Sequence, residues 1–154
     1  MVSQIPRRMQ MRSRRVADFR RTLQCRLVGV QAADSAPMSR DHRKLDAFHL
    51  ADELTLRIYA NTQAFPKEEM YGLRSQLRRA AVSIPTNIVE GCARDSKGDL
   101  LRFLDISFAS TREVNYLVDL ASRLRFIDAQ IAADLVQFGG RVAAALAALR
   151  KSHS

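Results

Sequence analysis

The side chains that most often do acid–base or metal chemistry are sparse in this sequence. Its three histidines are His42, His49 and His153, and Asp46 lies three residues before His49, the spacing of a metal site in a helical bundle. A di-iron site needs a Glu-x-x-His motif on two helices, and no such motif recurs. No histidine adjoins the candidate nucleophiles Ser83 and Cys92, and the sequence has no glycine-rich phosphate loop. We therefore expect no enzymatic activity, no metal site and no cofactor.

Arginines, by contrast, gather on one segment. Arg74 and Arg78 lie one helical turn apart, Arg79 follows directly, and Arg94 lies further along. Arginines that face outward in such a cluster neutralise RNA phosphates, whereas arginines beside carboxylates form ion pairs instead. Both alternatives stay open at this stage, and we predict Arg74, Arg78, Arg79 and Arg94 as the nucleic-acid-binding residues.

A polar series runs along the same segment at helical spacing. Its members are Gln76, Ser83, Asn87 and Glu90. Solvated helix faces are usually more strongly charged, whereas this series mixes a hydroxyl, two amides and a carboxylate that could bond across helices. Three uses stay open: hydrogen bonding to another helix or subunit, exposure to solvent, and ligand binding. We favour a polar packing surface or subunit interface.

Pro85 interrupts this segment, although the apolar period continues from Leu77 to Ile88. A proline inside a helix removes one backbone hydrogen bond, here to the carbonyl of Ala81, and it clashes with that carbonyl. We expect a kinked helix rather than two helices, with Ser83 satisfying the freed backbone group.

Four helical periods follow one another from Leu45 onward. The first runs from Leu45 to Thr62, and the second from Pro66, expected in its first turn, to Cys92. The third is roughly 30 residues long, with Ser96 as its N-cap and a seam spaced alternately by four and three residues. The fourth follows Asp128, a second N-cap, and ends near Leu149. The expected fold is therefore all-α, an antiparallel up-down-up-down four-helix bundle.

Small residues in two of these helices predict close approaches between backbones. Ser107 and Ser110 lie in the seam of the third helix, and Gly139 and Gly140 lie inside the fourth. A glycine inside a helix costs about 1 kcal/mol relative to alanine, so its presence favours tight contact with a neighbouring helix or subunit.

The basic character of the chain is concentrated at its N-terminus. Residues 1–40 carry nine Lys/Arg and two Asp/Glu, net +7, whereas residues 41–154 carry sixteen and fourteen, net +2. We divide the chain into a basic extension, 1–40, and a bundle, 41–151. The extension could be a disordered RNA-binding arm, an amphipathic segment, or an untranslated stretch before a start at Met38, and we favour a dispensable arm or the later start.

Cysteine use and hydropathy bear on the compartment. Cys25 and Cys92 form neither a disulfide framework nor a metal knuckle. No apolar run approaches the roughly 20 residues that span a bilayer, and the N-terminus lacks the apolar segment of a secretory signal. We expect a cytoplasmic protein without a membrane partner.

Three consecutive stretches resemble a known family: "KLDAFHLADELTLRIYANT", "FPKEEMYGLRSQLRRAAVSIPTNIVEGCAR" and "LLRFLDISFASTREVNYLVDLASRLRFID". Together they cover Lys44 to about Asp128. They resemble the bacterial four-helix-bundle proteins of 23S rRNA intervening sequences, and are similar to the accessory variability determinant of diversity-generating retroelements. The resemblance implies a ring-shaped homopentamer, and the retroelement relative implies binding to a reverse transcriptase and nucleic acid. The bundle's charge of only +2 departs from the strongly basic surface expected of that relative.

Two functions follow as hypotheses. The first is a non-enzymatic homo-oligomer that binds RNA or an RNA–protein complex through the four arginines. The alternative is a protein-interaction scaffold that recruits a partner enzyme, with nucleic acid incidental.

Overall fold

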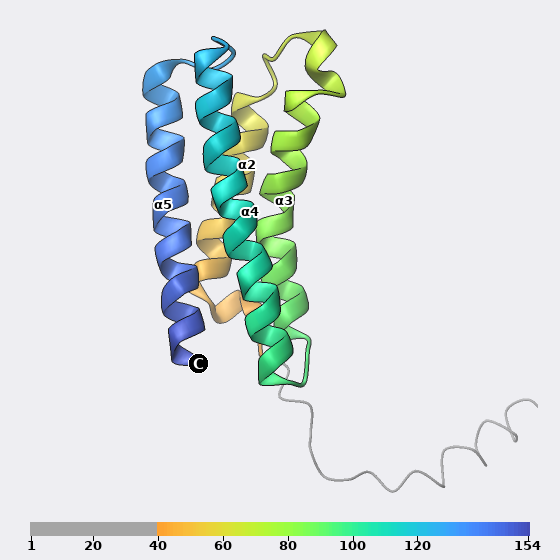
Figure 1. The fold of residues 1–154 in the computed structure, drawn as a ribbon, viewed down its shortest axis with the longest axis vertical. Coiled ribbons are helices and arrows are strands. Elements are labelled where there is room, and N and C mark those ends of the chain that lie inside the picture. Colours follow the sequence, from red (N-terminus) through yellow and green to blue (C-terminus); the bar gives the residue numbers. More distant parts are fainter. Residues whose placement is uncertain (1–39) are drawn as a thin grey trace, which may run out of the picture. The chain divides into compact units, whose positions relative to one another are not determined.

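The computed structural model describes residues 40–154 (Figure 1). The predictions for the N-terminal extension, Arg40 apart, lie outside the described residues. Helices and turns account for the described part, in this order: η1 (His42–Lys44), α2 (Asp46–Asn61), η2 (Lys67–Met70), α3 (Leu73–Cys92), α4 (Lys97–Arg123) and α5 (Ala129–Ser152). The predicted all-helical fold is confirmed, with α2 to α5 packed antiparallel.

Each long helix packs on two neighbours around a shared apolar core. The contacts run from α2 to α3, α3 to α4, α4 to α5 and α5 back to α2. The largest fully buried side chains include Leu54 and Ile58 of α2, Leu77 of α3, Leu104 of α4 and Leu146 of α5. One apolar stripe per helix therefore suffices to build the core, as the helical period of the sequence predicts.

Local capping chemistry sets the starts of α4 and α5. The Ser96 hydroxyl accepts a hydrogen bond from Asp99 N at 2.9 Å, and it donates to the Asp99 carboxylate at 2.7 Å. Asp128 Oδ1 accepts from Gln130 N at 2.8 Å. Both side chains satisfy backbone donors that the first turn of a helix leaves free. The two predicted N-caps are therefore confirmed.

The start of α3 differs from the prediction. Pro66 precedes the short 3-10 turn η2, and α3 begins only at Leu73, after Gly72. The Glu69 carboxylate accepts a hydrogen bond from Leu73 N at 2.8 Å and so caps the helix from the preceding turn. Met70, expected on the buried side of a continuous helix, is 48% exposed because the chain changes direction between η2 and α3.

Pro85 lies inside α3, which is bent by 35°. The freed carbonyl of Ala81 accepts a hydrogen bond from the Thr55 hydroxyl of α2 at 2.9 Å. The same hydroxyl lies 2.9 Å from the carbonyl of Ala51, one turn back in α2. The predicted kink is confirmed, but the prediction that Ser83 satisfies the freed group is wrong. Ser83 lies on the side of α3 that faces α4, whereas the Ala81 carbonyl is reached from α2.

Small residues allow α3 and α4 to pack closely. The Ser107 hydroxyl donates to the Ile84 carbonyl at 2.9 Å, and a Cβ on Gly91 would lie 3.0 Å from Phe103 Cβ. In α5, a Cβ on Gly139 would overlap the side-chain amide of Asn115 from α4, whereas one on Gly140 would meet nothing within 4 Å. The predicted close approach is therefore confirmed at Gly139, whereas within the described part of the subunit nothing approaches Gly140.

Among the described helices, α5 has the length and apolar composition that could span a membrane, so the prediction that no apolar run approaches this length is wrong. Its buried residues, among them Leu135, Phe138 and Val142, pack into the bundle core. A core helix of a helical bundle has the same length and composition, so this feature adds no support for a membrane role.

Candidate nucleic-acid interface

Two adjoining hollows lie along α3 on the side of α2 and share the lining residues Val82 and Thr86. We call them together the groove, and its two halves differ in chemistry. The half near η2, which we call the basic half, has a volume of about 620 Å³ and is lined by Tyr59, Met70, Arg74, Ser75, Arg78, Arg79 and Ser83. The other, which we call the apolar half, has about 540 Å³ and is lined by Phe48, Asp52, Pro85, Val89, Glu90 and Ala93. Val82 and Thr86 line both halves. Three of the four predicted nucleic-acid-binding arginines thus share one groove.

Arg78 is held in place by contacts to α2. Its Nε donates to the Thr62 hydroxyl at 2.8 Å, and a terminal guanidinium nitrogen donates to the Tyr59 carbonyl at 3.2 Å. Its guanidinium carbon lies 4.6 Å from the centroid of the Tyr59 ring. These bonds satisfy groups at the end of α2, where helix carbonyls lack intrahelical partners. Arg78 therefore has a structural task, and its charge still faces the groove.

Arg74 and Arg79 provide the positive charge of the basic half that is free to bind a ligand. Within residues 40–154 neither side chain has a hydrogen-bond or ion-pair partner, although carboxylates pair with arginines elsewhere in the bundle. Arg79 is exposed, and Arg74 is half-buried against the groove. Unpaired guanidinium groups beside an open groove can bind a phosphate without first breaking an ion pair.

Arg94 lies apart from the other three arginines. It lies two residues beyond the end of α3, whereas Arg74 lies in the first turn of that helix. It pairs with Glu90 one turn earlier, and its guanidinium carbon lies 5.1 Å from the centroid of the Phe103 ring. The four predicted arginines are therefore not one cluster in the structure.

The polar series on α3 divides into packing and surface residues. The Ser83 and Ser110 hydroxyls are 2.9 Å apart and link α3 to α4, and Asn87 Nδ2 donates to the Ser83 carbonyl at 2.7 Å and hydroxyl at 3.0 Å. Gln76 is exposed beside Arg79 in a shallow groove between α3 and α4, and Glu90 is exposed. Ser83 and Asn87 thus act in packing within the subunit, whereas Gln76 and Glu90 face the surface.

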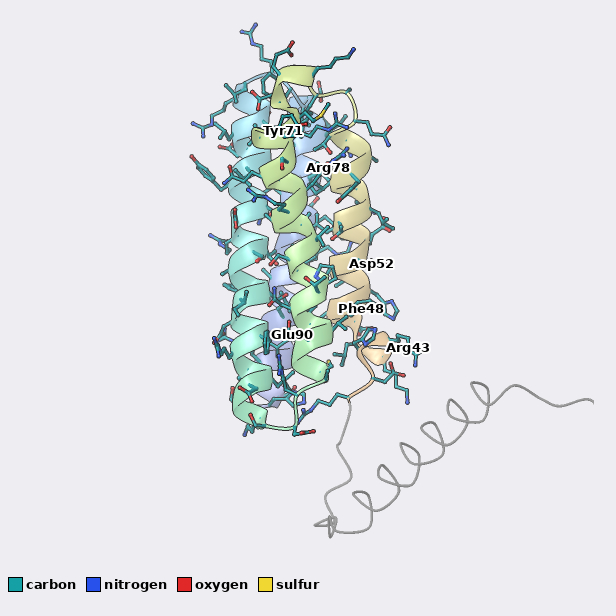
Figure 2. All side chains as sticks on the ribbon, turned by 90° about the vertical axis from the view of Figure 1, so that its right-hand side faces the viewer. Arg43, Phe48, Asp52, Tyr71, Arg78 and Glu90 are labelled. Carbon is teal, nitrogen blue, oxygen red and sulfur yellow. The ribbon has the colours of Figure 1, made fainter. Side chains whose placement is uncertain are left out.

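Acidic side chains distinguish the apolar half from the basic half. Asp52 and Glu90 lie at this end of the groove, together with Phe48, as Figure 2 shows. Negative charge repels phosphate, so the chemistry that favours RNA is confined to the basic half.

Two tyrosines that the sequence did not mark as site residues lie near the basic half: Tyr59 lines it, and Tyr71 ends the neighbouring turn η2. Tyr59 is 40% exposed and Tyr71 is 92% exposed. The helical period assigned Tyr59 to the core side of its helix, because it directly follows the buried Ile58 and lies at the edge of the apolar stripe. Tyr71 could have been identified from the sequence as an exposed aromatic residue near the arginines, since it lies one residue from a glycine and three from Arg74.

The titratable groups form no metal centre in the part of the chain described. Across residues 40–154, no three His, Cys, Asp or Glu side chains come close enough together to hold a metal ion. His49, the histidine of the metal-like spacing, instead shares a 2.8 Å hydrogen bond with the Arg43 carbonyl. Burial raises the pKa of the Cys92 thiol, which keeps it protonated near neutral pH.

Comparison with protein families decides the relationship that the sequence resemblance suggested. The family described as 23S rRNA-intervening sequence protein matches residues 43–148. The chain belongs to this family. The match covers α2 to α5 almost completely, so the groove and all four predicted arginines of this intervening-sequence protein lie within it.

Among solved structures, the intervening-sequence fold recurs in a protein of unknown function from the S23 ribosomal protein family of Bacteroides thetaiotaomicron. The two structures superimpose with a TM-score of 0.63 at 21% sequence identity, over 68% of this chain and 95% of the other. This similarity establishes the fold alone. No curated protein sequence matches the chain.

Proposed function

We propose that this protein is a non-enzymatic homo-oligomer that binds RNA, or an RNA–protein complex, through the basic half of the α2–α3 groove. One observation carries the proposal: Arg74 and Arg79 lie unpaired, within the described residues, beside an open groove whose third arginine, Arg78, is already fixed in position. A phosphate entering the groove meets guanidinium donors without the cost of breaking an ion pair. The family membership is consistent with this proposal.

In this proposal the four predicted arginines have different roles, which we assign from their contacts. Arg74 and Arg79 supply the phosphate contacts, and Arg78 adds charge while holding α2 to α3 through Thr62 and Tyr59. Arg94, paired with Glu90, contributes at most a secondary contact. Because the bundle itself carries only a small net charge, specific placement rather than total charge has to provide the affinity.

The oligomeric part of the proposal is supported by the apolar half of the groove. Val82 is 37% exposed and Val89 is 36% exposed, beside Phe48 and Pro85. A neighbouring copy that covered these side chains would remove apolar surface from water, a favourable change of about 25 cal/mol per Å². The ring-shaped homopentamer implied by the family resemblance is the assembly we propose. Light scattering after size exclusion should give five times the subunit mass, and a monomer would contradict it.

RNA binding is tested by charge reversal with a matched control. Arg74→Glu/Arg79→Glu should weaken binding of the full-length protein to 23S rRNA fragments and lower the slope of log K against log salt by about 1.4, or about 0.7 per lost single-strand contact. The control is Arg102→Glu/Arg112→Glu on α4, two exposed arginines whose reversal changes the net charge equally. Equal losses for the two double variants would show that only net charge matters, and would refute the groove as the RNA site.

A second function, a scaffold that recruits a partner enzyme such as a reverse transcriptase, is favoured by the same exposed apolar half. In that case capture of the partner survives the charge reversal at Arg74 and Arg79, whereas Val89→Asp abolishes it. The opposite pattern supports RNA binding as the primary function.

A further inference from the structure

We propose that the basic half of the groove recognises unpaired nucleotides and stacks their bases on Tyr59 and Tyr71. This inference rests on the proposed RNA-binding function and names the kind of RNA that the site takes. Its evidence is the combination, at one end of the groove, of free arginines with large exposed side chains that a double helix could not use.

The exposed side chains are unusual for a phosphate site. Tyr59 and Met70 line the basic half and are 40% and 48% exposed. Tyr71 does not line it, but follows Met70 directly, just before α3 begins, and is 92% exposed. Figure 2 shows Tyr71 and Arg78 at this same end. Phosphate binding alone requires cations and donors, not aromatic rings. Aromatic rings beside arginines are instead typical of proteins that bind single strands, where bases stack on the rings and phosphates meet the cations.

Tyr59 and Arg78 already form a rigid stacking platform. The Arg78 guanidinium lies over the Tyr59 ring, with its central carbon 4.6 Å from the ring centroid. Two hydrogen bonds, to Thr62 and to the Tyr59 carbonyl, fix the guanidinium in that orientation. A base can stack on an aromatic ring or on a guanidinium plane, and a prefixed platform loses little side-chain entropy on binding.

The remaining groups of the basic half fit the other parts of a nucleotide. Arg74 and Arg79 lie on the same groove and are free to meet phosphates. Ser75, half-buried in the groove, offers a hydroxyl that can bond a base edge or a ribose. The volume of about 620 Å³ lies within the usual range of small-molecule sites and accommodates a nucleotide.

The ends of the groove limit the path of the strand. From Arg74 to Thr86 the basic half extends 12 residues, about 18 Å along α3. Beyond it, Asp52 presents a carboxylate to the groove, and the arginine nearest to this end, Arg94, is already paired with Glu90. A bound strand should therefore lie over the basic half and leave the protein before it reaches the apolar half. A duplex buries the faces of its bases and could offer the tyrosines only its sugar-phosphate backbone.

The experiment compares two RNAs and three variants of the full-length protein. The probes are a strand without self-complementarity that carries 2-aminopurine, and a fully paired duplex with the same number of phosphates. Tyr71→Leu and Tyr59→Leu remove a stacking surface but keep an apolar side chain. The matched control is Tyr116→Leu, since Tyr116 is 60% exposed on α4, outside the groove.

We expect the single strand to bind about tenfold more tightly than the duplex, with quenching of the 2-aminopurine fluorescence. Tyr71→Leu and Tyr59→Leu should each weaken single-strand binding by about fivefold or more, as for the loss of one stacked base, and leave duplex binding unchanged. Tyr116→Leu should change neither affinity. Tyr71 makes no hydrogen bond through its side chain within residues 40–154, so its variant should fold normally even if Tyr59→Leu does not.

Three results would overturn the inference. Equal affinity for the two RNAs, unaffected by Tyr71→Leu, would leave the proposed RNA-binding function standing but remove base stacking. Absence of salt-dependent binding to either RNA would remove the proposed function itself. A change in oligomeric mass in Tyr71→Leu would show that this end of the groove is an interface between copies.

Discussion

The hydrogen bond between Thr55 and the carbonyl of Ala81 joins α2 to α3 at the level of Pro85, and replacing Thr55 by valine tests its role. The side chains of threonine and valine have nearly the same shape, and Thr55 is only 9% exposed. The substitution removes the hydroxyl that donates to the Ala81 carbonyl at 2.9 Å. Pro85 cannot donate to this carbonyl instead, because proline has no backbone N–H. An unsatisfied buried acceptor costs about 1–3 kcal/mol, so Thr55→Val should lower the free energy of unfolding by that amount.

Thr86→Val provides a matched control on α3. The Thr86 hydroxyl donates to the Val82 carbonyl at 2.8 Å within its own helix, and Thr86 is exposed. Each valine substitution removes a hydrogen bond to the carbonyl four residues earlier in the same helix. Only Thr55 also donates to a carbonyl, that of Ala81, which lacks its helical partner because of Pro85. Thr86→Val should therefore change the free energy of unfolding by less than about 0.5 kcal/mol.

Pro85→Ala completes a double-mutant cycle. Alanine restores the backbone N–H that can bond the Ala81 carbonyl within α3. In this background Thr55→Val should cost about 1 kcal/mol less than in the wild-type protein, which is the coupling energy of the pair. Urea unfolding, followed by circular dichroism, measures all four proteins, and a constant m-value shows that the comparison is valid. If Thr55→Val cost the same with either residue at position 85, the proposed compensation would be refuted.

Two further predictions concern α5 and the buried thiol. Gly140→Ala should raise the midpoint of thermal unfolding, because alanine favours a helix by about 1 kcal/mol and a Cβ there meets open space. Gly139→Ala should fail to raise it, because the Asn115 amide has to move; equal gains in the two variants would refute the close packing. Burial raises the pKa of Cys92, so its thiolate is disfavoured only in the folded state. Stability is therefore unaffected below the unfolded thiol pKa of about 8.5 and should fall as the pH rises above it. In a Cys25→Ser background, alkylation of Cys92 at pH 8 should be slow until denaturant is added, and rapid alkylation of the native protein would contradict its burial.

Features that depend on neighbouring residues in sequence were predictable. Ser96 and Asp128 were identified as N-caps because a cap needs only a side-chain oxygen and the first turn of its own helix. The bend at Pro85 was predictable for the same reason, since the clash lies within one turn. The short turn η2 was missed because Pro66 is compatible with the start of either kind of helix.

For features that depend on contacts between helices, the sequence predicted the type of residue involved but not its partner. The sequence identified a group of arginines, but Arg78 is distinguished from Arg74 by its bonds to Thr62 and Tyr59. These two residues lie at the C-terminal end of α2, 16 and 19 residues away from Arg78 in the sequence. The sequence likewise required a partner for the Ala81 carbonyl, and the nearest hydroxyl along the chain was not the nearest in space. Which face of α3 meets α2 decides both cases, and residue spacing within one helix does not contain that information.

The groove itself follows from the way α2 and α3 are joined. Arg78 links the helices near η2 through Thr62 and Tyr59, and Thr55 links them at the level of the bend. These hydrogen bonds add to the contacts of the core. The outward-facing apolar side chains of α2 and α3 are therefore not needed to hold the two helices together. Tyr59, Val82 and Val89 consequently remain exposed along the groove. The guanidinium groups at one end of the groove and the Asp52 carboxylate at the other support the proposal that the basic half, rather than the apolar half, binds RNA.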